Sequence, residues 1–166
     1  KIPSDLPLDY GIVAPYIELP WLSAGRLVVL LTATSRDDKL WDEVNWMQVA
    51  QALVNRGLTP VFPSGSTLER QRVERLAAAV PGAIVAPALN LNELASLIAR
   101  AALAIGVDTG LAHLAAALKV PTIALYISTD PALTGVYGSG FFQNLGNTGH
   151  PPTAAQVMAV AEQVLR

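Results

Sequence analysis

Short apolar runs alternate with segments that carry apolar residues at helical spacing, and this alternation restricts the possible folds. Leu27–Leu31 and Leu103–Val107 are continuous apolar runs of the length expected for strands buried on both faces of a sheet. Further short strands are predicted at Pro60–Phe62, Ala83–Ala86 and Thr122–Ile127. Strands and helices that alternate with short connections predict an α/β fold with a doubly wound parallel sheet.

The segments between these strands have the spacing of amphipathic helices. Asp42–Arg56 carries apolar residues on one side, and Gly57 after it is a typical helix stop. The other helices are predicted at Thr67–Val80, Asn90–Ala101, Thr109–Leu118 and Thr153–Leu165. The Gly-rich stretch Ser128–Pro152 is expected to be a loop, and its length makes it a candidate for function.

Composition excludes several classes of function. The 166 residues carry a net charge of −2, whereas a nucleic-acid-binding protein needs a basic surface. There is no cysteine, so disulfides, thiolate nucleophiles and cysteine metal sites are excluded. The only histidines, His113 and His150, are far apart in sequence, and no metal centre is expected. Residues 1–25 are Pro-rich and are predicted to be a linker, and residues 26–166 are predicted to form one domain.

Polar side chains follow three of the predicted strands. Ligands of open parallel sheets bind outside the carboxyl ends of the strands, so these side chains are candidates for a binding site. In chain order they are Thr34, Ser35 and Lys39, then Glu69, then Asp108, Thr109 and Gly110.

Asp108-Thr109-Gly110 stands at the start of a predicted helix. Asp108 is expected to cap that helix, and the free amides of its first turn favour an anion. Gly110 has no side chain and lets a phosphate approach the backbone. His113 falls on the helix face opposite the apolar stripe that includes Leu111, which leaves it free to face a ligand. By itself the same turn is more typical of an ordinary helix cap than of a phosphate site.

The loop after the first strand strengthens the interpretation as a phosphate site. Thr34 and Ser35 supply hydroxyl groups and Lys39 supplies an ammonium group, a set that suits a diphosphate. Glu69 is placed to accept hydrogen bonds from ribose hydroxyls, although an acidic residue in a first turn also stabilises a helix by itself.

Other phosphate-binding and hydrolytic motifs are absent from the sequence. It has no G-x-x-x-x-G-K-[ST] loop, no G-x-G-x-x-G before its first helix and no G-x-S-x-G elbow. These absences argue against a P-loop enzyme, a dinucleotide-binding dehydrogenase and an α/β-hydrolase.

Two separated motifs resemble bacterial lipopolysaccharide heptosyltransferases. One is Val107–Leu118, followed by Pro121-Thr122, Leu125-Tyr126 and Thr129-Asp130-Pro131; the other is Ala33–Trp41. The Asp-Thr-Gly turn is similar to that of the type I rather than the type II enzymes. The resemblance implies the GT-B architecture of two Rossmann-like domains, with this chain as the C-terminal, donor-binding domain and the N-terminal acceptor domain absent from it.

The resemblance also implies a reaction and a set of binding residues. Such enzymes transfer L-glycero-D-manno-heptose from ADP-heptose to Kdo-lipid A, with inversion at the anomeric carbon. They need no cofactor and no obligatory metal, and they act in the cytoplasm, at the inner membrane. By this resemblance Thr34, Ser35, Lys39, Asp108, Thr109 and Gly110 contact the diphosphate and sugar, with His113 close by, while Glu69 holds the ribose and Leu89 lines the adenine pocket. The catalytic base is expected in the absent domain, so this chain alone is expected to be inactive.

Two other hypotheses about function are consistent with these residues. One is a type II heptosyltransferase or another nucleotide-sugar transferase, and the other is a non-catalytic nucleotide-binding module. Ile127 stands where the family often has Gly, which leaves the identity of the sugar open.

Overall fold

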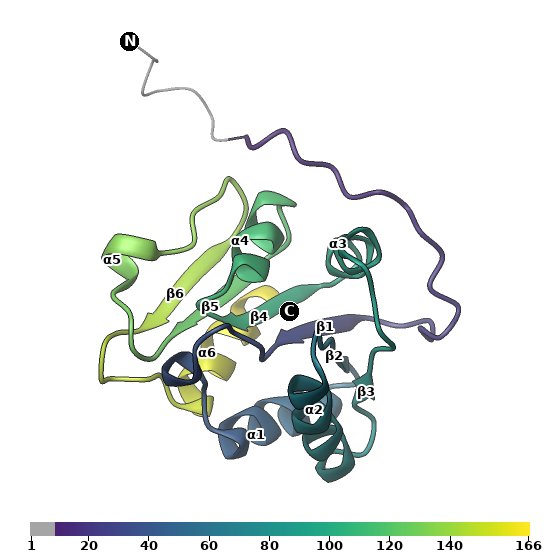
Figure 1. The fold of residues 1–166 in the computed structure, drawn as a ribbon, viewed down its shortest axis with the longest axis horizontal. Helices are drawn as coiled ribbons and strands as arrows, with labels where there is room; N and C mark the ends of the chain where they lie inside the picture. Colours follow the sequence, from purple (N-terminus) through teal and green to yellow (C-terminus); the bar gives the residue numbers. More distant parts are fainter. Residues whose placement is uncertain (1–8) are drawn as a thin grey trace.

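The computed structural model describes residues 9–166, and the strands form one six-stranded sheet (Figure 1). The strands are β1 (Leu27–Leu31), β2 (Thr59–Phe62), β3 (Ile84–Val85), β4 (Leu103–Val107), β5 (Thr122–Tyr126) and β6 (Phe142–Gly146). Their order is β3-β2-β1-β4-β5-β6, and every neighbouring pair is parallel. This is the doubly wound parallel sheet that the alternating pattern predicts.

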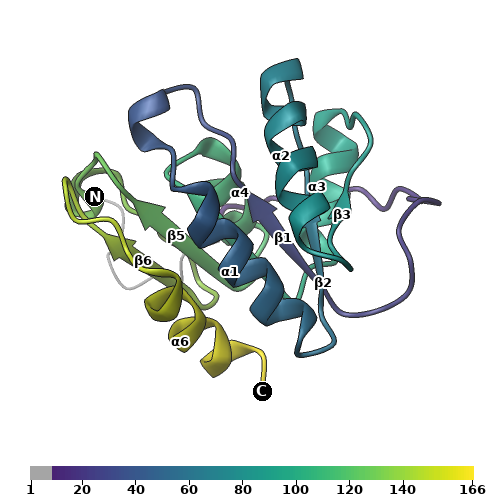
Figure 2. The same cartoon turned by 90° about the horizontal axis from the view of Figure 1, so that it is seen from below.

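Helices cover both faces of the sheet. They are η1 (Asp37–Lys39), α1 (Glu43–Val54), α2 (Thr67–Ala79), α3 (Leu91–Ala99), α4 (Gly110–Ala117), α5 (Pro131–Thr134) and α6 (Ala154–Val164). Figure 2 shows α1, α2 and α6 on one side of the sheet, with α3 and α4 on the other. Within residues 9–166, no helix is long and apolar enough to cross a membrane.

Alternate side chains of β1 pack into apolar cores on opposite faces of the sheet. In β1, Val28 and Leu30 pack toward α1, α2 and α6, while Val29 and Leu31 pack toward α3 and α4. All five residues of β1 are buried, since successive side chains of a strand point to opposite faces and both faces are covered. The apolar runs in the sequence are therefore the central strands.

The prediction that Ser128–Pro152 is a loop was wrong for two of its segments. Pro131–Thr134 forms the short helix α5, and Phe142–Gly146 forms β6, which pairs with β5 along its whole length. β6 is an edge strand that contains Gln143 and Asn144 and is only half-buried. Because it lacks the apolar run of a central strand, its pattern gave no strand signal.

The side chains of Tyr126 and Asn144 fasten the connection between β5 and β6. The hydroxyl of Tyr126 donates to the carbonyl of Thr134 at 3.1 Å and accepts from the amide of Val136 at 3.0 Å. The side-chain amide of Asn144 bonds both the amide and the carbonyl of Val136, each at 3.0 Å. Burial raises the pKa of Tyr126 to about 12, so the hydroxyl keeps its proton and these contacts at neutral pH.

The described part of the predicted linker, residues 9–25, contains no helix or strand and runs along the outside of the domain (Figure 1). The amide of Ile17 donates to the hydroxyl of Ser96 in α3 at 3.0 Å, and the guanidinium of Arg100 bonds the carbonyl of Ile17. Asp9 pairs with Lys119 at 3.0 Å. Residues 1–8 of the predicted linker lie outside the described residues.

Candidate functional site

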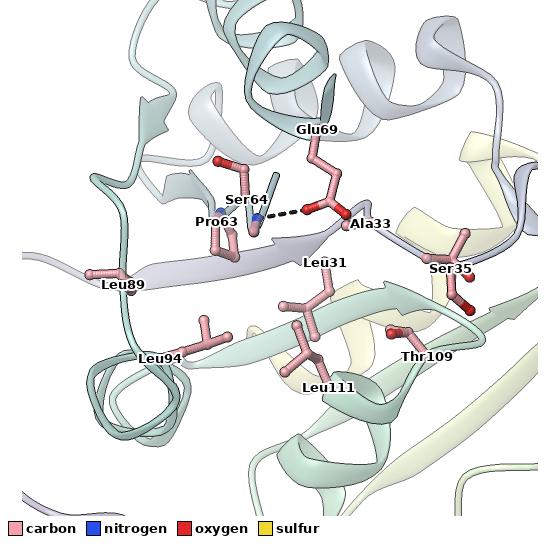
Figure 3. A pocket seen from close by; sticks show the side chains of 12 residues that line it. Leu31, Ala33, Ser35, Pro63, Ser64, Glu69, Leu89, Leu94, Thr109 and Leu111 are labelled. Carbon is pink, nitrogen blue, oxygen red and sulfur yellow. Dashed lines mark hydrogen bonds between the residues drawn. The ribbon is translucent and has the colours of Figure 1, made fainter. Parts of the chain in front are cut away.

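The three polar strand ends meet at one edge of the sheet, around a pocket of about 280 Å³ (Figure 3). It is lined by Leu31, Ala33, Thr34, Ser35, Pro63, Ser64, Gly65, Glu69, Leu89, Leu94, Thr109 and Leu111. Chain order reverses between the neighbouring strands β1 and β4, so the pocket lies at the topological switch point where doubly wound sheets bind ligands.

The pocket has an apolar end and a polar end. Figure 3 shows Leu89 and Leu94 at one end and Ser35 and Thr109 at the other, with Leu111 between them. A flat aromatic base fits between aliphatic side chains, whereas hydroxyl groups suit phosphate or sugar oxygens. The polarity of the pocket therefore changes along its length in the way that a nucleotide requires.

Glu69 lines the pocket and also caps a helix. Its Oε2 accepts hydrogen bonds from the amides of Gly65 at 2.6 Å and Ser66 at 3.2 Å, while the hydroxyl of Ser66 accepts from the amide of Glu69 at 3.3 Å. These bonds form a complete capping box at the start of α2. The structural alternative raised by the sequence is thus present, and a ribose contact stays a prediction.

Among the described residues, no side chain caps the N-terminus of α4. Thr109 is the N-cap residue, with extended backbone, and its side chain makes no capping hydrogen bond. Gly110 is exposed, and a Cβ atom at that position would have nothing within 4 Å. Because the first amides of a helix have no acceptor within the helix, this end of α4 is suited to an anion beside the pocket.

The prediction that Asp108 caps α4 was wrong. Its carboxylate is 6% exposed, and its Oδ2 accepts a hydrogen bond from the ammonium of Lys39 at 2.7 Å. The hydroxyl of Thr129 donates to the same oxygen at 2.8 Å. The side chain faces these partners because they satisfy a buried charge, which would otherwise be strongly destabilising.

Lys39 and Asp108 lie at the same edge of the sheet, as predicted. They form an ion pair with each other, however, and neither lines the pocket. Thr129 was missed as a site residue because it falls in the segment predicted to be a loop. The run Thr129-Asp130-Pro131 contributed to the family resemblance, and that was its one signal in the sequence.

His113 lies on α4, is exposed and does not line the pocket. It faces away from the core as predicted, but the buried residues of α4 are alanines, and Leu111 is only half-buried. Small side chains let α4 pack closely on the sheet, which explains why the alanines form the buried face. Ile127 packs against the core shared with α1 and α6 and does not reach the pocket.

Known proteins with a similar sequence identify the family. Residues 16–161 match the family model described as glycosyltransferase family 9 (heptosyltransferase). The chain belongs to glycosyltransferase family 9. Lipopolysaccharide heptosyltransferase 1 of Salmonella typhimurium is 39% identical over 145 residues, which cover 84% of this chain and 46% of that protein. The corresponding protein of Pseudomonas aeruginosa is 44% identical over 111 residues, 67% of this chain and 31% of its own.

Solved structures of family 9 enzymes share the fold. Escherichia coli heptosyltransferase WaaC with ADP has a TM-score of 0.77 and 36% identity, and WaaC with ADP-2-deoxy-2-fluoro heptose has a TM-score of 0.75 at the same identity. Both matches cover 84% of this chain and 44% of WaaC. The predictions of a heptosyltransferase relationship and of a Rossmann-like domain of GT-B type are confirmed. The chain spans less than half the length of these relatives.

Proposed function

We propose that this chain is the donor-binding domain of a heptosyltransferase that transfers L-glycero-D-manno-heptose from ADP-heptose to Kdo-lipid A during assembly of the lipopolysaccharide core. One observation carries the proposal: an uncapped helix N-terminus stands at the polar end of a pocket whose other end is aliphatic. The WaaC structures that match this chain hold ADP and an ADP-heptose analogue, which supports an ADP-sugar as the donor.

In the proposed binding mode the donor lies along the length of the pocket. The adenine lies at the aliphatic end beside Leu89, and the ribose lies near Glu69. The diphosphate then reaches the hydroxyls of Thr34 and Ser35 and the free amides that follow Thr109 at the start of α4. Gly110 lets the phosphate approach closely, since its exposed α-carbon carries no side chain.

These residues are proposed to stabilise ADP as the leaving group. When the bond between the anomeric carbon and the diphosphate breaks, negative charge grows on ADP. Oriented amides at the start of α4 and the ammonium of Lys39 stabilise that charge. The acceptor hydroxyl displaces ADP directly, which inverts the configuration at the anomeric carbon. The base that removes the proton of this hydroxyl is supplied by a second domain. This chain alone is expected to bind the donor without transferring it.

The reaction is proposed to take place in the cytoplasm, at the cytoplasmic face of the inner membrane, where the lipid acceptor is exposed. The proposed reaction involves no nucleic acid. It also involves no bound metal, because backbone amides and one ammonium group supply the positive charge that stabilises the diphosphate.

Calorimetric titration of the chain with ADP-heptose, ADP and UDP tests the proposal. We expect ADP-heptose and ADP to bind and UDP to bind at least tenfold more weakly, since a purine buries more apolar area against Leu89 and Leu94 than the smaller pyrimidine does. Preference for UDP would move the chain to another nucleotide-sugar transferase. Absence of any nucleotide binding would contradict the proposal.

Removing the Lys39 ammonium should weaken diphosphate binding specifically. We expect Lys39→Met to lower the affinity for ADP by about 10- to 100-fold, the range of a hydrogen bond to a charged group, and to leave adenosine binding unchanged. Lys119→Met is the matched control, because Lys119 pairs with Asp9 and follows the C-terminal end of α4, whereas the diphosphate is proposed at the N-terminal end of that helix. Equal losses for ADP and adenosine would contradict the role of Lys39.

A further inference from the structure

One carboxylate oxygen of Asp108 accepts hydrogen bonds from two donors, which lie in different loops. The ammonium of Lys39, in the loop after β1, lies 2.7 Å from Oδ2 of Asp108. The hydroxyl of Thr129, in the loop after β5, donates to the same atom at 2.8 Å. Only Lys39 carries a charge that a diphosphate attracts, so the two contacts have different consequences once a donor binds.

Burial makes the second contact important. Asp108 is 6% exposed and Lys39 is 18% exposed, so the carboxylate has little water to replace a lost partner. If Lys39 turns toward a diphosphate, Asp108 gives up the cation that balances its charge. The Thr129 hydroxyl then remains to satisfy Oδ2, and this lowers the free energy needed to release the ammonium.

The loop that carries Thr129 is anchored on both sides. The buried Tyr126 precedes it in β5, with its hydroxyl bonded to Thr134 and Val136. Asp130 follows it and caps α5 by accepting from the amide of Ala132 at 2.8 Å. The hydroxyl of Thr129 is therefore delivered to Asp108 by a loop whose ends are fixed.

We propose that Thr129 is a positioning residue for the diphosphate: its hydroxyl holds the Asp108 carboxylate and so frees the Lys39 ammonium to reach the ligand. This inference rests on the proposed function, because it takes the ligand to be a nucleoside diphosphate. Thr129 acts through Asp108 and Lys39 and touches no ligand itself.

Titrations with ADP and adenosine test the role of the hydroxyl. We expect Thr129→Val to lower the affinity for ADP about three- to tenfold, as one lost hydrogen bond would, and to leave adenosine unchanged. Thr129→Ser keeps the hydroxyl and should restore ADP binding. Thr148→Val, at an exposed threonine outside the pocket, is the matched control. A merely structural role would change both affinities together, or would leave the Ser variant as weak as the Val variant.

A double-mutant cycle measures the same coupling without ligand. The free energies of unfolding of Lys39→Met, Thr129→Val and the double variant should be non-additive, by about threefold or more in the unfolding equilibrium constant, because both residues bind one carboxylate. Additivity would overturn the inference.

The two experiments separate the failures. If the parent chain binds ADP and Thr129→Val binds it equally well, the inference is wrong and the proposed function stands. If the parent binds no ADP, the proposed function fails and the positioning of a diphosphate fails with it.

Discussion

Two helices begin beside the same pocket, and their N-termini differ. The amides at the start of α2 are satisfied by the protein itself, through the capping box of Ser66 and Glu69. α4 begins after Thr109 without any side-chain cap and with no acidic residue in its first turn. One helix end thus already holds a carboxylate, while the other is open to an anion from outside.

The difference is the reason for proposing that the phosphate binds at α4 rather than at α2. A second anion at α2 would meet the charge of Glu69, whereas at α4 it would find free amides and the positive end of the helix dipole. Asp108, the acidic residue next to α4, is already paired with Lys39. We therefore propose that a nucleotide lies with its phosphates toward α4 and its ribose toward α2.

Closing the open helix end should have the largest effect. Thr109→Asp places a carboxylate at the N-cap of α4, and we expect ADP affinity to fall by about 100-fold through like-charge repulsion and competition for the amides. Thr109→Asn is the matched control, since it can cap the helix without a charge. ADP titrations of both variants provide the measurement. An Asp variant that binds ADP as tightly as the Asn variant would place the phosphate elsewhere.

Opening the closed helix end should have a smaller effect, mainly on stability. Glu69→Ala removes the capping box of α2, and we expect the free energy of unfolding to fall by about 1 kcal/mol in urea denaturation. Glu93→Ala removes the equivalent capping box of α3, which Asn90 and Glu93 form, and should destabilise to a similar extent.

ADP binding distinguishes these two variants. Only Glu69 lines the pocket, so only Glu69→Ala should also weaken ADP binding, by a few-fold at most. Equal ADP affinities in the two variants would remove Glu69 from the ribose site and leave it as a helix cap alone.

The smallest change adds one methyl group at the open end. Gly110 has ordinary backbone angles and open space around it, so Gly110→Ala should raise the free energy of unfolding by about 0.5 kcal/mol. The same methyl stands where the phosphate approaches, and ADP affinity should fall roughly threefold. Thermal unfolding and ADP titration measure the two effects. A more stable variant with unchanged ADP affinity would show that the phosphate keeps away from Gly110.

Much of the fold and part of the site could be predicted because they depend on local pattern. β1 and β4 have the bounds expected from the apolar runs Leu27–Leu31 and Leu103–Val107. Thr34, Ser35, Glu69 and Thr109 line the pocket, since the carboxyl ends of parallel strands meet at one edge. Leu89 also lines it, and only the family resemblance had pointed to that residue. Their direct contacts with a ligand stay predictions.

Errors arose where partners come from distant parts of the chain. β6 was missed because an edge strand needs only one covered face, and its identity depends on pairing with β5. Asp108 was predicted to cap α4 because the amides at the start of that helix are the hydrogen-bond donors nearest to its carboxylate along the chain. The partner it binds, Lys39, is 69 positions away.

By itself, the sequence determined the parallel sheet, the position of its central strands and the edge at which a ligand binds, because hydrophobic periodicity and strand direction are properties of each segment. The tertiary structure alone decided that the capped α2 and the open α4 begin beside one pocket, and that Thr129 meets Asp108 and Lys39. Buried polar groups must find partners, and which partners are within reach is settled only when strands far apart in the chain lie side by side.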